Sequence, residues 1–135
     1  MRTETNKKFH ISDVLSVATP YLLSSRHMEG VYEIMNWLTG ESLFTHQLPR
    51  AHKPCAEFLA AVFPMLCNGA MEELPANAGK GEWDYAGYVN RMTANYGEWF
   101  DVPAMPEGEF YKAMHPLEEP ILEGKNVIVL ESAND

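Results

Sequence analysis

Residues 25–55 read SRHMEGVYEIMNWLTGESLFTHQLPRAHKPC and carry the clearest structural pattern in the chain. The apolar residues of the first half recur at helical spacing and form one stripe: Met28, Val31, Ile34, Met35 and Leu38. This spacing predicts a helix over residues 26–39, with Gly40 as its left-handed C-terminal cap. The turn that follows, THQLPR at 45–50, is crowded with polar groups but matches no motif of known chemistry.

Prolines and a capping residue set the limits of two further helices. A helix is predicted over residues 13–19, with Ser12 as its N-cap. The next one is predicted to start near Lys53, because Pro54 is tolerated in the first turn of a helix but not in its interior. Pro64 marks the end of that helix.

The second half of the chain alternates between loops and short regular elements. Glycines and prolines over residues 67–81 indicate a surface loop. A helix over residues 81–96 follows, and Gly97 stops it. Residues 99–102 and the β-branched segment NVIVL at 126–130 are strand candidates, and we expect them to pair with each other.

Together these elements predict an α+β fold. It is a mostly helical single domain over residues 1–135, with a small two- or three-stranded sheet formed mainly by the C-terminal part. A chain of 135 residues holds one core rather than two, and 46% hydrophobic residues are enough to form it. Residues 1–9 are expected to be loose or strand-like.

The formal net charge of −9 is unevenly distributed along the chain. Residues 1–67 carry six acids and six bases, whereas residues 68–135 carry 13 acids and four bases. A field of this sign repels phosphate backbones and attracts basic protein surfaces. The charge therefore favours a protein partner with a basic surface over direct nucleic-acid binding, although acidity also serves solubility alone.

Compartment is inferred from the absence of targeting signals. Residues 1–8 lack the apolar core of a signal peptide, and the longest apolar stretch, residues 58–66, is too short to cross a bilayer. We therefore expect a cytoplasmic protein without a membrane partner, whose Cys55 and Cys67 are reduced. No glycine-rich phosphate loop occurs, and no cofactor is expected.

The polar turn offers two candidates for chemistry. His46, His52 and Cys55 are ligands that zinc accepts, but their spacing matches no closed zinc site. The alternative is an irregular turn held by hydrogen bonds from Thr45, His46 and Arg50. A Cys–His nucleophile pair is also conceivable, since a thiol at a helix N-terminus has a lowered pKa. No oxyanion hole is recognisable, and no catalytic residue is assigned.

Several segments resemble a family of small phage and prophage proteins of unknown function: FHISDVLSV (9–17), SRHMEGVYEIMNWLTG (25–40), LFTHQLPRA (43–51), YGEWFDVPAMP (96–106), HPLEEPI (115–121) and NVIVLE (126–131). The most specific stretch is 25–51. One departure is HKPC at 52–55, where the family has a continuous helix. The resemblance implies a phage accessory protein that acts inside an infected bacterium, and it transfers no catalytic assignment.

These observations lead to the hypothesis that the chain inhibits a bacterial defence complex, in the manner of an anti-CRISPR protein. An acidic surface with exposed tryptophans would cover a basic surface of a host protein or nucleoprotein. The candidate partner-binding residues are Glu72, Glu73, Glu82, Trp83, Asp84, Glu98, Trp99, Asp101, Glu107 and Glu109. The alternatives are a ligand-binding protein or enzyme using residues 45–55, and a virion assembly protein. The chain itself is expected to be a monomer or homodimer.

Overall fold

The computed structural model describes residues 5–106. The chain separates into two compact units, Met1–Met105 and Pro106–Asp135, and nearly all the described residues belong to the first. The elements in order are β1 (Asn6–His10), α1 (Ile11–Ala18), α2 (Met28–Thr39), η1 (Thr45–Gln47), α3 (Leu48–Val62), α4 (Pro64–Glu72), α5 (Tyr85–Tyr96) and β2 (Trp99–Pro103). The predicted mostly helical α+β fold is confirmed, while a single domain over all 135 residues stays a prediction.

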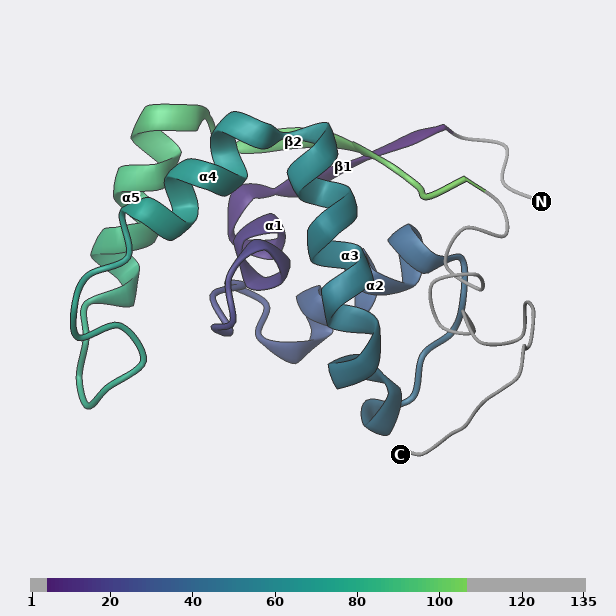
Figure 1. Cartoon of the computed structure of the whole chain (residues 1–135), viewed down its shortest axis with the longest axis horizontal. Helices are drawn as coiled ribbons and strands as arrows, with labels where there is room; N and C mark the ends of the chain where they lie inside the picture. The colour runs from purple at the N-terminus through teal and green to yellow at the C-terminus, as the bar shows by residue number, and fades with distance from the viewer. Residues whose placement is uncertain (1–4, 107–135) are drawn as a thin grey trace, which may run out of the picture. The chain divides into compact units, whose positions relative to one another are not determined.

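Helix α1 lies at the centre of the first unit (Figure 1). It packs against all four of the longer helices and follows directly from β1. All residues from Ile11 to Val17 are buried, so the helix has no solvent face. A helix of eight residues is too short to be stable alone, and its stability comes from this packing.

The start of α1 differs from the prediction. His10, rather than Ser12, is the N-cap, and its Nδ1 accepts a hydrogen bond from the Ser12 backbone N–H at 3.1 Å. Strand β1 runs straight into the helix, which places Ser12 inside the first turn. Its hydroxyl instead accepts a bond from the Ser25 N–H at 3.1 Å.

Buried polar side chains of α1 hold the loop between α1 and α2. The Ser16 hydroxyl accepts hydrogen bonds from the N–H groups of Leu23 and Ser24, both at 2.7 Å. The Asp13 carboxylate accepts a bond from the Ser24 hydroxyl and pairs with the Arg26 guanidinium at 2.7 Å. The side chain of Asp13 is 2% exposed. Its charge is therefore tolerated only because both oxygens have partners.

Two further ion pairs connect the partner of Asp13 to the other elements. Arg26 also binds Glu33 on α2, and Glu33 binds Lys7 on β1 at 2.9 Å. The hydrogen bond from Lys7, followed by that from Arg26, lowers the pKa of Glu33 below its ordinary value. This chain of charges joins β1, α1 and α2.

Helix α2 has the predicted buried stripe, but it begins two residues later than expected. Its N-cap, His27, has φ 58° and ψ −139°, a backbone conformation that is strained for any residue but glycine. Met28, predicted to be buried, is 41% exposed. At the other end Gly40 is left-handed, with φ 76°, as predicted.

Helix α3 corrects the prediction that Pro54 lies near its start. It begins at Leu48, with Pro54 inside it. The residues that it buries lie on both sides of Pro54: Leu48, Ala51, Cys55 and Leu59. Pro54 removes the hydrogen bond to the Arg50 carbonyl and crowds that carbonyl with its ring. Arg50 is exposed, and burial of the opposite face of the helix outweighs this cost.

Helix α4 corrects the predicted loop over 67–81, because residues up to Glu72 are helical. Pro64 takes the favoured first position of the helix. A side chain at Gly69 would displace the Tyr96 ring, since a Cβ there would lie 2.0 Å from the Tyr96 hydroxyl. Within the described residues no single helix is long and apolar enough to cross a membrane. Only Thr45–Val62 and Pro64–Glu72 taken together, across a bend of 117°, reach that length and composition.

Strands β1 and β2 form an antiparallel pair, with Phe9 opposite Phe100 and Lys8 opposite Asp101. The strand predicted at 99–102 is confirmed, and its observed neighbour comes from the N-terminus. Its expected neighbour, 126–130, lies outside the described residues. The Trp37 indole donates to the Val102 carbonyl at 2.8 Å and so ties β2 to α2.

We expect Asp13→Asn to lower the free energy of unfolding by about 2 kcal/mol, because an amide placed against Arg26 leaves a buried polar group unsatisfied. Chemical denaturation measures this loss. Asp101→Asn is the matched control, since Asp101 forms a 3.6 Å pair with Lys8 whose side chains are both more than 60% exposed. Equal effects of the two substitutions would contradict the role assigned to Asp13.

Gly30→Ala is expected to destabilise the protein by about 2 kcal/mol through overpacking. A Cβ at this position would lie 2.1 Å from the Ser24 hydroxyl and 2.4 Å from an Asp13 carboxylate oxygen. The neighbouring exposed substitution Glu29→Ala serves as the control, with a change within about 0.5 kcal/mol. Thermal melting of both variants checks the difference, and a Gly30→Ala variant as stable as the control would contradict the close contact.

Candidate functional site

An aromatic cluster with two carboxylates surrounds the start of α5. We call Tyr21, Glu82, Trp83, Asp84 and Tyr85 the Trp83 surface. The Trp83 ring lies 5.3 Å from that of Tyr21 and 6.2 Å from that of Tyr85, between ring centroids. Tyr85 is 56% exposed and Trp83 is half-buried. The cluster therefore presents ring surface to solvent while its inner side is packed.

The packing beneath Trp83 is anchored on α4. The Trp83 ring lies 6.0 Å from that of Tyr88, which is fully buried and donates its hydroxyl hydrogen bond to the Ala70 carbonyl. Burial raises the pKa of Tyr88 to about 12, so this hydroxyl keeps its proton. The rings on the Trp83 surface thus rest on a fixed base.

The loop before α5 is shaped around Tyr21. The Tyr21 hydroxyl donates to the Ala78 carbonyl at 3.3 Å. Gly79 has φ 76°, and a Cβ there would lie 2.4 Å from the Tyr21 ring. Only glycine satisfies both the left-handed backbone and the close approach.

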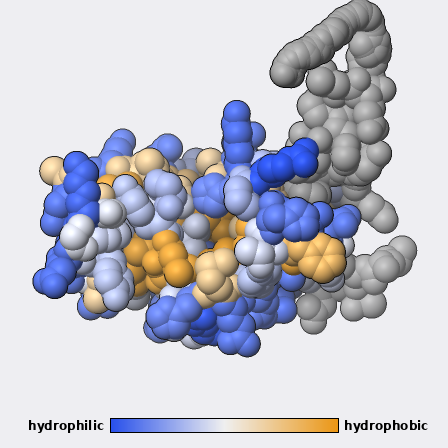
Figure 2. All heavy atoms as spheres, turned by 90° about the horizontal axis from the view of Figure 1, so that it is seen from below, coloured by the Kyte–Doolittle hydropathy of each residue, from blue (hydrophilic) through white to orange (hydrophobic). Residues whose placement is uncertain are grey.

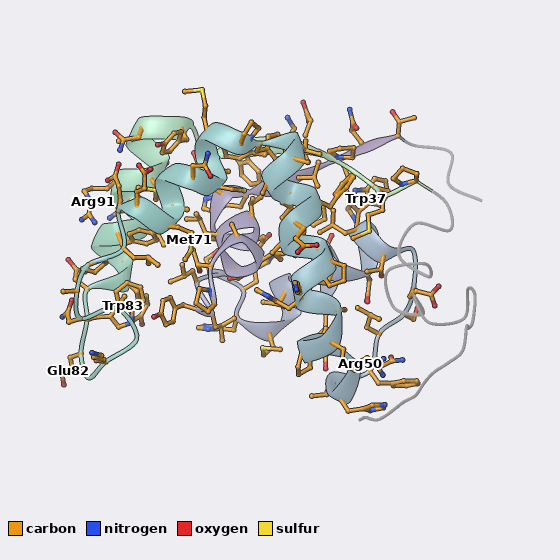
Figure 3. The ribbon with its side chains drawn as sticks, in the orientation of Figure 1. Trp37, Arg50, Met71, Glu82, Trp83 and Arg91 are labelled. Atoms are coloured by element: carbon orange, nitrogen blue, oxygen red, sulfur yellow. The ribbon has the colours of Figure 1, made fainter. Side chains whose placement is uncertain are left out.

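The carboxylates of the Trp83 surface face solvent. Asp84 is the N-cap of α5, and its carboxylate accepts a hydrogen bond from the Gly87 N–H at 2.9 Å. Glu82 is exposed, and within residues 5–106 neither carboxylate has an ion-pair partner. Lys80, two residues before Glu82 in the sequence, is also exposed. Figure 3 shows Glu82 and Trp83 at one end of the described part.

The second tryptophan predicted to bind a partner lies on the sheet, at the other end of α5. Trp99 is 56% exposed, and its ring meets that of His10 edge to face at 5.1 Å. Glu98 lies 3.3 Å from the Nε2 of His10. Asp101, on the same strand, pairs with Lys8. The acids at this end therefore already have cationic or imidazole neighbours.

The predicted partner-binding residues thus fall into separate groups. Glu82, Trp83 and Asp84 precede α5, whereas Glu98, Trp99 and Asp101 follow it, and its 12 residues span about 18 Å. Glu72 and Glu73 lie at the end of α4, where Arg91 is 3.9 Å from Glu73. Glu107 and Glu109 lie outside the described residues. Partner binding by these residues stays a prediction.

The three candidate zinc ligands do not come together. His46 stacks parallel to Phe44 at 6.1 Å, and the Nε2 of His52 lies 3.3 Å from the Thr19 carbonyl oxygen. Cys55 is fully buried in α3. In the part of the chain that the structure describes, no three His, Cys, Asp or Glu side chains are placed to hold a metal ion.

Both thiols are buried and protonated. Cys55 lies in the interior of α3 rather than at a helix N-terminus, which corrects the expectation that a helix start lowers its pKa. Burial raises the pKa of Cys55 from 9.0 to about 12 and that of Cys67 to about 11. A nucleophilic role needs the thiolate, so the geometry does not favour one for either residue.

One exposed surface was not recognised as such from the sequence. Phe44 is 68% exposed beside His46, and Arg50 and Lys53 are exposed in the first turns of α3. We call Phe44, His46, Arg50 and Lys53 the Phe44 surface. An aromatic residue inside the polar turn SLFTHQ was the available signal. On the face seen in Figure 2, hydrophobic residues are exposed in the middle of the described part, with hydrophilic residues around them.

Raised pKa values at the buried thiols and Tyr88 predict sensitivity to alkali. Since these groups ionise more readily in the unfolded chain, their contribution to stability is complete below pH 9 and is lost as the pH rises towards 12.

Below pH 9 we also expect iodoacetamide to modify Cys55 and Cys67 far more slowly in the native than in the denatured protein. Mass spectrometry measures this ratio, and equal rates would contradict the burial.

Comparison with known proteins adds one match. A family model described as a domain of unknown function (DUF7736) matches residues 9–69. This stretch extends from the end of β1 through α1, α2 and α3 into α4, so it contains the Asp13–Arg26 pair and the Phe44 surface but not residues 72–109. No curated protein and no solved structure is significantly similar to the chain. The match therefore fits an uncharacterised family.

Proposed function

We propose that the chain is a phage-encoded accessory protein that binds and inhibits a bacterial host complex, of the kind that anti-CRISPR proteins inhibit. It would act in the host cytoplasm, on a protein or nucleoprotein with a basic surface, without binding nucleic acid itself. The phage origin is supported by the resemblance of segments 9–17, 25–40 and 43–51 to phage proteins.

The observation that carries the proposal is the Trp83 surface. Tryptophan and tyrosine side chains on a rigid base are the usual centres of binding energy in protein interfaces. Here they lie beside two exposed carboxylates that have no ion-pair partner in the described part of the chain. Such carboxylates attract a basic partner and speed its association. At the Trp99 end, by contrast, Glu98 and Asp101 already lie beside His10 and Lys8.

The enzymatic alternative receives less support. It requires a reactive cluster among residues 45–55, but His52 contacts a backbone carbonyl, and Cys55 is a buried neutral thiol. The exposed rings of the Phe44 surface remain available for binding rather than for covalent chemistry.

The proposal is tested with bacteria that carry a defined, active CRISPR–Cas complex and are challenged with a targeted phage. Expression of the wild-type chain should raise the number of plaques, and the purified chain should bind the purified complex more weakly as salt increases. Glu82→Lys with Asp84→Asn should abolish both effects while keeping the helix cap, since asparagine caps as well as aspartate.

Glu98→Lys with Asp101→Asn is the matched control, because it changes the charge by the same amount at the Trp99 end. Thermal melts establish that both variants are folded. A wild-type chain that neither protects phages nor binds any of a panel of defence complexes would overturn the proposal. Loss of binding in the control variant alone would move the contact from the Trp83 surface to the sheet.

A further inference from the structure

The Phe44 surface and the Trp83 surface carry charges of opposite sign. Figure 3 shows Arg50 and Glu82 at opposite ends of the described part. Arg50 and Lys53 are exposed in the first turns of α3, which follows Phe44 and η1 in the chain, and Glu82 and Asp84 are exposed on either side of Trp83 in the sequence. We propose that these two surfaces bind each other between copies of the chain, so that the protein self-associates head to tail.

Charge complementarity favours this pairing over pairing of like surfaces. A guanidinium and an ammonium on one surface face two carboxylates on the other, whereas two copies of the Trp83 surface would bring carboxylates together. Each surface also has one residue of the other sign near it in the sequence: Lys80 precedes Glu82 by two residues, and Glu57 lies about one helical turn beyond Lys53.

Aromatic side chains supply the apolar part of the contact. Phe44 is 68% exposed and Tyr85 is 56% exposed, so each loses unfavourable contact with water when the other surface covers it. The ring faces of Trp83 and Tyr85 also attract a guanidinium such as that of Arg50 through cation–π interaction. Aromatic residues and arginine are the side chains enriched at protein interfaces.

A contact between two different surfaces is heterologous. It leaves one Phe44 surface and one Trp83 surface free at the ends of every assembly, so copies add until a ring closes or a filament grows. The inference does not depend on the proposed function, because it needs no host protein. Both use the Trp83 surface, however, and a basic target would compete with the second copy.

Sedimentation velocity and light scattering on the full chain test the inference without a host component. At low salt the average mass should rise with concentration above that of the monomer. At 1 M salt, where the screening length is about 3 Å, it should return towards the monomer. A wild-type chain with the monomer mass at the highest concentration and the lowest salt would overturn the inference.

Two charge variants then identify the surfaces. Glu82→Lys with Asp84→Asn should be monomeric, as should Arg50→Glu with Lys53→Glu, since each makes the two surfaces alike in sign. An equimolar mixture of the two variants should associate again, because each then meets its opposite. Failure of the mixture to associate, or unchanged self-association of either variant alone, would contradict the pairing.

Glu98→Lys with Asp101→Asn controls for net charge, because it matches the change made at the Trp83 surface. It should self-associate like the wild type. If it were monomeric as well, overall charge rather than the two surfaces would govern association, and the inference would fail. Thermal melts of all three variants exclude misfolding as the cause of a lost association.

Discussion

The rest of the first unit depends on the hydrogen bond and the ion pair that the buried Asp13 carboxylate forms. This carboxylate lies on a helix without a solvent face, and its partners come from outside that helix: the Ser24 hydroxyl and the Arg26 guanidinium. Because an unpaired buried charge is expensive, the loop has to pass where these partners reach the carboxylate. The start of α2, and with it the close approach of Gly30, follows from this placement.

The same network explains why a strained residue persists. His27 keeps a conformation that costs on the order of 1–3 kcal/mol, and such strain survives only where the surroundings determine it. Here the hydrogen bonds that the Ser12 and Ser16 hydroxyls accept from backbone N–H groups of the loop, together with the Asp13 ion pair, supply that constraint. Buried ion pairs are seldom the most stabilising choice for a core, so this one is better understood as specifying a single loop path.

The buried polar network and the Trp83 surface lie in different parts of the sequence. The stretch that the family model matches, 9–69, contains the network around Asp13, whereas most of the Trp83 surface lies at the junction of the 73–84 loop with α5. The Phe44 surface lies within the matched residues, whereas the Trp83 surface lies outside them apart from Tyr21.

Periodicity and capping in the sequence determined much of the fold. The stripe from Val31 to Leu38, the Gly40 cap and the strand at 99–102 were predictable, because they depend on neighbours in sequence. The helical conformation around Pro54 and of 67–72 was not, since burial against other elements outweighs local propensity there. The separation of Glu82 from Glu98 and the ion pair between Asp13 and Arg26 depend on how α1 and α5 pack. Composition revealed an acidic chain, but only the tertiary structure decided which carboxylates are buried, which are paired and which face solvent.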